Sequence, residues 1–158
     1  MKKSILILFL TLVFSSISYG NVEARKYILI HAPKHVSKYL NHVWDDAEWC
    51  SKEYGIPLAL ILAQMCLESG YGSSYYAKTR NNHLGIKFGH NYAKFCSLRN
   101  CLDAYGSSLT QNKYLDHDCE SISCWLFALD SNCYHFGGNL YSNKILSIIS
   151  KYKLDLLV

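Results

Sequence analysis

Apolar positions in the first half of the chain recur at the spacing of α-helices. Over Val36–Tyr54 they return every three or four residues, and Gly55 follows as a stop signal. Pro57 then stands where a first helical residue is expected, and Leu58–Ser69 is a nearly continuous apolar run closed by Gly70. Because a helix that is apolar on all sides has to be covered, this second helix is predicted to be largely buried.

The pattern changes after Gly70. Glycines, tyrosines and the pair Asn81-Asn82 favour turns and short extended pieces, and a small hairpin is predicted within Ile86–Phe95. Helical spacing then returns in three stretches, namely Leu98–Leu109, Ser121–Leu129 and Ile145–Tyr152. The chain is therefore predicted to be mainly α (α+β), a single domain with a small irregular or β-hairpin insert.

The first 20 residues have the layout of a signal peptide. Lys2 and Lys3 precede an apolar run from Ile5 to Phe14, and Ser18 and Gly20 supply the small residues of a cleavage site. We expect cleavage after Gly20, which leaves one compact domain over residues 21–158. An uncleaved membrane anchor is the alternative. Both interpretations place the working part of the protein outside the cytoplasm, in the periplasm, in the medium or at the cell wall.

Charge and cysteine content narrow the function further. The formal net charge of +4 includes Lys2 and Lys3, so residues 21–158 carry only +2. A charge this small does not indicate a nucleic-acid-binding surface. We expect no membrane contact beyond the signal segment. The seven cysteines all lie after residue 20 and include no Cys-x-x-Cys pair, so we expect no metal site. Some disulfides are expected. The odd number leaves at least one thiol unpaired within the chain, and Cys66 is our candidate because it lies in the apolar helix.

Glu68 is the residue with the clearest chemical potential. It lies at the end of the most apolar helix and is the only acid between Glu53 and Asp103. Burial disfavours the charged form of a carboxyl, so the pKa of Glu68 is predicted to be raised. A protonated carboxyl can donate its proton to a leaving glycosidic oxygen. The alternative is a helix-end Glu that simply reaches solvent.

Two neighbouring segments carry a family resemblance. Residues 63–74 read Ala-Gln-Met-Cys-Leu-Glu-Ser-Gly-Tyr-Gly-Ser-Ser, and residues 81–87 read Asn-Asn-His-Leu-Gly-Ile-Lys. Together they closely resemble the signature of the glucosaminidase family, glycoside hydrolase family 73, which occurs in flagellar muramidase-like proteins and bacterial autolysins. The resemblance extends over Leu98–Tyr114, Cys133-Tyr134 and Tyr141–Ile145, and so covers nearly all of residues 21–158.

The resemblance implies a lysozyme-like fold and an activity. An enzyme of this family cleaves the β-1,4 bond after N-acetylglucosamine in peptidoglycan, with Glu68 as the general acid and without a cofactor. We expect peptidoglycan glycan strands as the partner and a monomeric protein. Tyr71 and Tyr141 are predicted to stack on sugar rings, and Tyr134 aligns with a family tyrosine in the active-site cleft. Asn82 is predicted to hydrogen-bond the substrate or to orient its loop, the alternative being an ordinary turn former.

The chain departs from the family in its second carboxylate. Glycosidases usually need one, yet no Asp or Glu occurs between Glu68 and Asp103. Asp103 or a later acid such as Asp116 could supply it, the substrate's own 2-acetamido group could act as nucleophile, or activity could be lost. We favour substrate assistance, with Tyr134 stabilising the developing charge. The segment from Tyr134 to Tyr141 is also one residue longer than in the family and lacks its acid.

Two other functions stay open. A lytic transglycosylase also uses one Glu after a long helix, but such enzymes resemble a Gly-Leu-Met-Gln segment where this chain has Leu84-Gly85-Ile86-Lys87. The missing second acid motivates the other alternative, a catalytically inactive module that binds glycan. His83, His90 and His135 lie in regions assigned to the cleft, and a lone histidine there is assigned no role.

Overall fold

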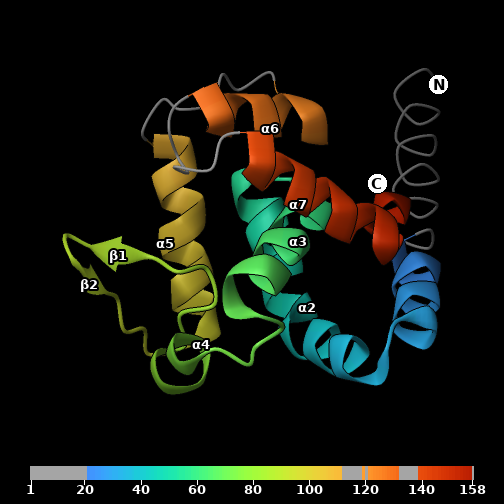
Figure 1. Ribbon diagram of the computed structural model, residues 1–158, viewed down its shortest axis with the longest axis horizontal. Helices are drawn as coiled ribbons and strands as arrows, with labels where there is room; N and C mark the ends of the chain where they lie inside the picture. Colours follow the sequence, from blue (N-terminus) through green and yellow to red (C-terminus); the bar gives the residue numbers. More distant parts are fainter. Residues whose placement is uncertain (1–20, 112–118, 120, 132–138, 158) are drawn as a thin grey trace, which may run out of the picture.

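In the computed structural model, helix α3 (Leu58–Ser69) runs through the middle of the molecule, between α2 (Lys34–Tyr54) and α7 (Asn139–Lys151) (Figure 1). The structure describes residues 21–111, 119, 121–131 and 139–157. The expected signal peptide, residues 1–20, lies outside these residues. No helix in the described part combines the length and apolarity that a membrane crossing requires.

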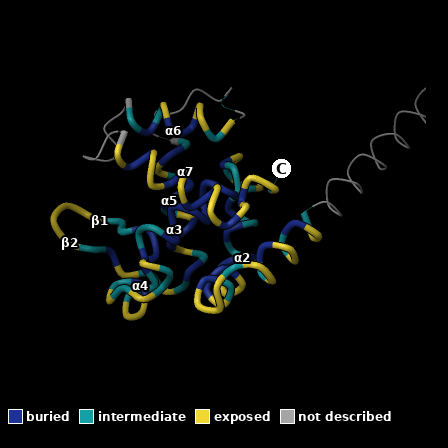
Figure 2. Tube along the Cα trace, turned by 45° about the vertical axis from the view of Figure 1, so that its right-hand side comes forward, coloured by how far each residue is buried: buried dark blue, intermediate teal, exposed yellow. Residues whose placement is uncertain are grey.

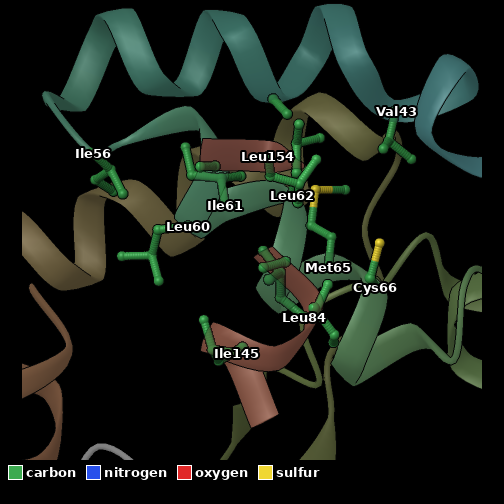
Figure 3. Packing of buried hydrophobic residues seen from close by; sticks show 14 of the residues in the cluster. Val43, Ile56, Leu60, Ile61, Leu62, Met65, Cys66, Leu84, Ile145 and Leu154 are labelled. Atoms are coloured by element: carbon green, nitrogen blue, oxygen red, sulfur yellow. The ribbon is translucent and has the colours of Figure 1, made fainter. Parts of the chain in front are cut away.

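The two central helices differ in how much of their surface is covered. Helix α2 buries one stripe at three- and four-residue spacing, whereas α3 is covered on every side, as its continuous apolar run predicts (Figure 3). Each helix ends at a glycine in the left-handed region, α2 at Gly55 (φ 67°) and α3 at Gly70 (φ 55°). The buried stripe of α2 consists of Val36, Tyr39, Leu40, Val43, Trp44, Ala47 and Cys50.

The remaining helices pack around this pair. Helix α5 (Leu98–Gln111) lies along α2, where Arg99 pairs with Asp46 at 2.7 Å. Helix α6 (Ile122–Ser131) contacts α7, and the short 3₁₀ helix η1 (Leu154–Leu156) returns to α3. Residues 21–31 are also helical, which the spacing did not predict, and bury Ala24 and Ile28.

A small lobe projects from the helices on one side. It contains α4 (Tyr75–Arg80) and an antiparallel pair of strands, β1 (Lys87–Phe88) and β2 (Asn91–Tyr92), with Lys87 opposite Tyr92. The outer end of this hairpin is exposed, in contrast to the buried centre of α3 (Figure 2). The expected hairpin within Ile86–Phe95 and the mainly α class are therefore confirmed.

The helix boundaries differ from the expected ones by a few residues. Helix α2 begins at Lys34 directly after Pro33, and α6 ends at Ser131. The largest correction concerns α7, which begins at Asn139, before the apolar positions that start at Ile145. Its first turns are held by Tyr141, which is buried and hydrogen-bonded to Gln64 of α3.

The cysteines divide into one disulfide and several free thiols. Cys119 and Cys124 are bonded, with their Cα atoms 5.5 Å apart. Cys66 is free and fully buried, as expected for that position. Burial raises the pKa of its thiol to about 12, so it behaves as an apolar side chain. Cys50 and Cys101 are also free and buried, and Cys96 is free and exposed. Cys133 lies outside the described residues.

Candidate active site

Glu68 lies where the buried part of α3 reaches the surface. The helix is buried from Ala59 through Cys66, whereas Leu67 and Glu68 are half-buried. The chain then leaves the helix sharply at Gly70, and the Tyr71 N–H donates to the carbonyl of Cys66 at 3.0 Å. The carboxyl group is thus carried on a rigid element and placed at the boundary between the core and the solvent.

The loop after α4 meets this carboxylate. A Cβ atom added to Gly85 would lie 3.3 Å from Glu68 Oε2, and Gly85 has a φ of 66°, which favours glycine. The preceding residue, Leu84, is anchored in the same apolar cluster as Met65 and Cys66 (Figure 3). The two sequence segments that carry the family resemblance therefore meet at Glu68.

Asn82 holds that loop in shape. Its side chain is buried, and its amide Nδ2 donates to the carbonyls of Ile86 at 2.8 Å and Ala93 at 3.1 Å. Its Oδ1 accepts from the Ile86 N–H at 3.0 Å. Both amide hydrogens are used within the protein, which fits the loop-orienting interpretation of Asn82. A contact with the substrate stays a prediction.

Ser69 and Tyr39 hold the turn after Glu68 in place. Ser69 is buried, and its Oγ lies 2.9 Å from the Tyr39 hydroxyl and accepts from the Gly72 N–H at 2.7 Å. Gly72 packs flat on the Tyr39 ring, because a Cβ there would stand 2.7 Å from Tyr39 Cδ2. The Tyr39 hydroxyl also meets His83 Nδ1 at 3.0 Å. This network ties the turn after α3 to the loop that carries Gly85.

Tyr71 is positioned by two other aromatic rings. Its φ is 55°, and its ring meets those of His35 and Tyr152 edge to face, with centroids 5.8 and 6.0 Å apart. The Tyr152 hydroxyl donates to the Tyr71 hydroxyl at 3.2 Å. Burial raises the pKa of Tyr71 above its usual range. Stacking of Tyr71 on a sugar ring stays a prediction.

A buried amide supports α3 one turn before Glu68. Gln64 Nε2 donates to the Tyr141 hydroxyl at 3.0 Å, and the Tyr105 hydroxyl donates to Gln64 Oε1. Tyr141 is therefore placed in the core beside α3, and its predicted stacking on a sugar stays untested. The anchoring role of Gln64 was missed from the sequence, where the signal was a single amide within the apolar run.

Asp103 is not brought to Glu68. Its side chain is exposed, and the Tyr54 hydroxyl donates to its Oδ1 at 2.5 Å. Tyr105 of the same helix faces α3 through Gln64, and a separation of two residues turns a helix by about 200°. Asp103 therefore faces away from α3. The other acid considered, Asp116, and the predicted catalytic Tyr134 lie outside the described residues.

Potential metal ligands do not gather at the site in the described part of the chain. Among residues 21–111, 119, 121–131 and 139–157, no three His, Cys, Asp or Glu side chains gather in a way that could hold a metal ion.

Comparisons with known proteins agree with this geometry. The family model of the glucosaminidases, described as mannosyl-glycoprotein endo-beta-N-acetylglucosaminidase, matches residues 44–154. No curated protein matches the chain.

Two solved structures are similar to the chain. The catalytic domain of the autolysin Auto from Listeria monocytogenes superposes with a TM-score of 0.65 at 19% identity, over 80% of this chain and 88% of that one. The glycoside hydrolase domain of FlgJ from Salmonella typhimurium superposes with a TM-score of 0.62 at 23% identity, over 76% of this chain and 89% of that one. These likenesses confirm the expected mainly α, lysozyme-like fold.

Proposed function

The chain belongs to the glucosaminidase family, and from this premise we propose that it hydrolyses the β-1,4 bond after N-acetylglucosamine in peptidoglycan, with Glu68 as the general acid. The observation that carries the proposal is the placement of the Glu68 carboxylate against Gly85, which joins the two family segments at one point. A lysozyme-like fold alone can host several activities, so the proposed function depends on the residues of this site.

The proposed first step is proton transfer to the leaving oxygen. Glu68 is half-buried at the end of α3, so its carboxyl group can be reached from the solvent. The protonated carboxyl donates to the glycosidic oxygen as the bond from that oxygen to the anomeric carbon breaks. The ionised carboxylate then accepts a proton from the water that completes hydrolysis.

The proposed nucleophile is the substrate's own 2-acetamido group. No acid occurs between Glu68 and Asp103, and Asp103 faces away from α3 while bonded to Tyr54. The acetamido carbonyl oxygen forms a bond to the anomeric carbon as the leaving group departs, and water later opens this ring. We assign Tyr134 to stabilising the developing positive charge and Tyr71, Asn82 and Tyr141 to contacts with the glycan.

A glycan-binding module without turnover is the second candidate. The missing carboxylate between Glu68 and Asp103 favours it, because loss of that group removes half of the usual machinery. In either case the proposed place of action is outside the cytoplasm. The Cys119–Cys124 disulfide supports an oxidising compartment, since such bonds persist there.

Analysis of reaction products tests the proposed function. Protein expressed from the full chain is incubated with purified peptidoglycan, and the released fragments are identified by mass. Fragments that end in reducing N-acetylglucosamine support the proposed hydrolysis. Fragments that end in anhydromuramic acid identify a lytic transglycosylase instead, and binding of glycan without any fragments identifies the non-catalytic module.

A further inference from the structure

A second concave site lies beside the proposed active site. A pocket of about 340 Å³ opens between the first half of α2 and the segment from Tyr71 to His83, which includes α4. Glu68 is not among its lining residues. The pocket nevertheless shares its walls with the site, because Gly72 follows the turn after Glu68 and His83 stands two residues before Gly85.

The lining of this pocket is basic. It contains five basic side chains and no carboxylate, with His35, Lys38 and His42 on α2, Lys78 on α4 and His83 on the loop. The two lysines and the two histidines of α2 are exposed around the rim, whereas His83 is buried. The floor and the rim thus differ in solvent access.

The positive charge of the rim is not neutralised within the described part of the chain. The ion pairs there join Arg25 to Asp45, Lys52 to Glu48 and Arg99 to Asp46, and none involves Lys38 or Lys78. Asp45 and Asp46 are the acids of α2 nearest to His42, and both are occupied by arginines. The field inside the pocket is therefore positive, which attracts anions.

His83, which forms the floor of the pocket, is held in place by aromatic and hydrogen-bonding contacts. The His83 and Tyr39 rings lie nearly parallel, 11° apart, and His83 Nδ1 meets the Tyr39 hydroxyl at 3.0 Å. Desolvation, with a further contribution from the charge of His42, lowers the pKa of His83 to about 4. His83 is thus neutral at pH 7 and keeps one N–H donor, while the lysines supply the charge.

We propose that this pocket is a binding site for an oxyanion, a carboxylate or phosphate group seated between Lys38 and Lys78 above His83. On the premise of the proposed function, its source is a carboxylate of the peptide stems that peptidoglycan strands carry. The pocket would then hold a stem while the neighbouring glycan lies at Glu68. Anion binding itself does not depend on catalysis, so it can be tested in an inactive variant.

Nuclear magnetic resonance titration tests this proposal without any turnover. The imidazole signals of His35 and His42 are followed in full-chain protein at constant ionic strength, with N-acetylmuramyl dipeptide as the carboxylate probe and inorganic phosphate as the other. Saturable shifts with the dipeptide identify the stem carboxylate as the source, and shifts with phosphate alone identify a free anion. The absence of a saturable shift with both probes overturns the proposal.

A charge-matched pair of variants shows whether the pocket is responsible. Lys38→Gln/Lys78→Gln removes two rim charges, and affinity should fall about thirtyfold, since each exposed charge contributes about 1 kcal/mol at contact distance and each step of about 1.4 kcal/mol is a factor of ten. Lys94→Gln/Lys144→Gln removes the same charge from exposed positions outside the pocket and should leave affinity unchanged. Equal losses in the two variants would show nonspecific attraction and overturn the proposal. Because the four lysines are exposed, circular dichroism should show both variants folded.

Discussion

The Oε2 atom of Glu68 lies so close to Gly85 that a Cβ at that position would stand 3.3 Å from it. The end of α3 and the loop after α4 therefore meet at this carboxyl group. The backbone of residue 85 lies against this carboxyl group, and Asn82 and Leu84 in turn hold that loop in place.

Gly85→Ala should reduce activity more than stability. A left-handed φ costs a non-glycine residue about 1 kcal/mol, and the added methyl group also displaces the Glu68 carboxylate. A displacement of a few tenths of an ångström should lower kcat about tenfold, because catalytic groups tolerate little misplacement. Gly89→Ala is the matched control, since Gly89 has a φ of 61° and no atom within 4 Å of its added Cβ. Equal kcat values for the two variants would contradict the role given to Gly85.

Asn82→Ala should destabilise the protein strongly. The substitution removes three hydrogen bonds, a buried one to Ala93 and two partly buried ones to Ile86, and leaves these backbone groups without this partner. The expected loss is about 2–4 kcal/mol of unfolding free energy, measured by denaturant titration. The exposed Asn100→Ala should lose less than about 1 kcal/mol. An unchanged free energy of unfolding for Asn82→Ala would contradict the role of Asn82 in shaping the loop.

Asp103→Asn should leave activity within about twofold of the wild type, because Asp103 faces away from α3 and an asparagine can still accept the Tyr54 hydrogen bond. The measurement is initial-rate turnover of peptidoglycan. If this variant is instead as inactive as Glu68→Gln, Asp103 is the second carboxylate, and the substrate-assisted mechanism is wrong.

Stability should decline on mild acidification because of His83. Its pKa is about 4 in the folded protein, below the roughly 6.5 of an unfolded chain, so the unfolded state binds more protons between these values. The contribution is present above pH 6.5 and is lost as pH falls towards 4. The melting temperature of His83→Gln should therefore vary less with pH over this window than that of the wild type. The exposed His90→Gln serves as control and should follow the wild type.

The sequence predicted those elements whose apolar residues face a common core. The stripe of α2 and the continuous run of α3 indicate buried helices directly, since burial follows the helical period. The helix over residues 21–31 was missed because only Ala24 and Ile28 are buried along it. The start of α7 was missed because Tyr141 is held there by a hydrogen bond to Gln64, which spacing does not reveal.

The site was only partly predictable, because contacts between segments that are distant in the chain do not show in the sequence pattern. Glu68 is indicated by its position at the end of the apolar helix, and the segment with Gly85 by the family resemblance, but the contact between them depends on how the loop packs. The basic pocket combines Lys38 and Lys78, which lie 40 residues apart in the chain, and no sequence period links them. Sequence reasoning assigned His83 no role, because its pairing with Tyr39 exists only in the folded chain.

The most direct test of the central claim is the turnover of purified peptidoglycan by the wild type and Glu68→Gln across pH. Glu53→Gln, an exposed change of the same chemistry on α2, is the control. We expect the control to match the wild type, Glu68→Gln to be folded and reduced at least about a hundredfold, and wild-type activity to fall as pH rises and Glu68 loses its proton. A folded Glu68→Gln variant that turns over peptidoglycan at the wild-type rate, or a wild-type rate that stays flat at alkaline pH while the fold is intact, would contradict the general-acid role.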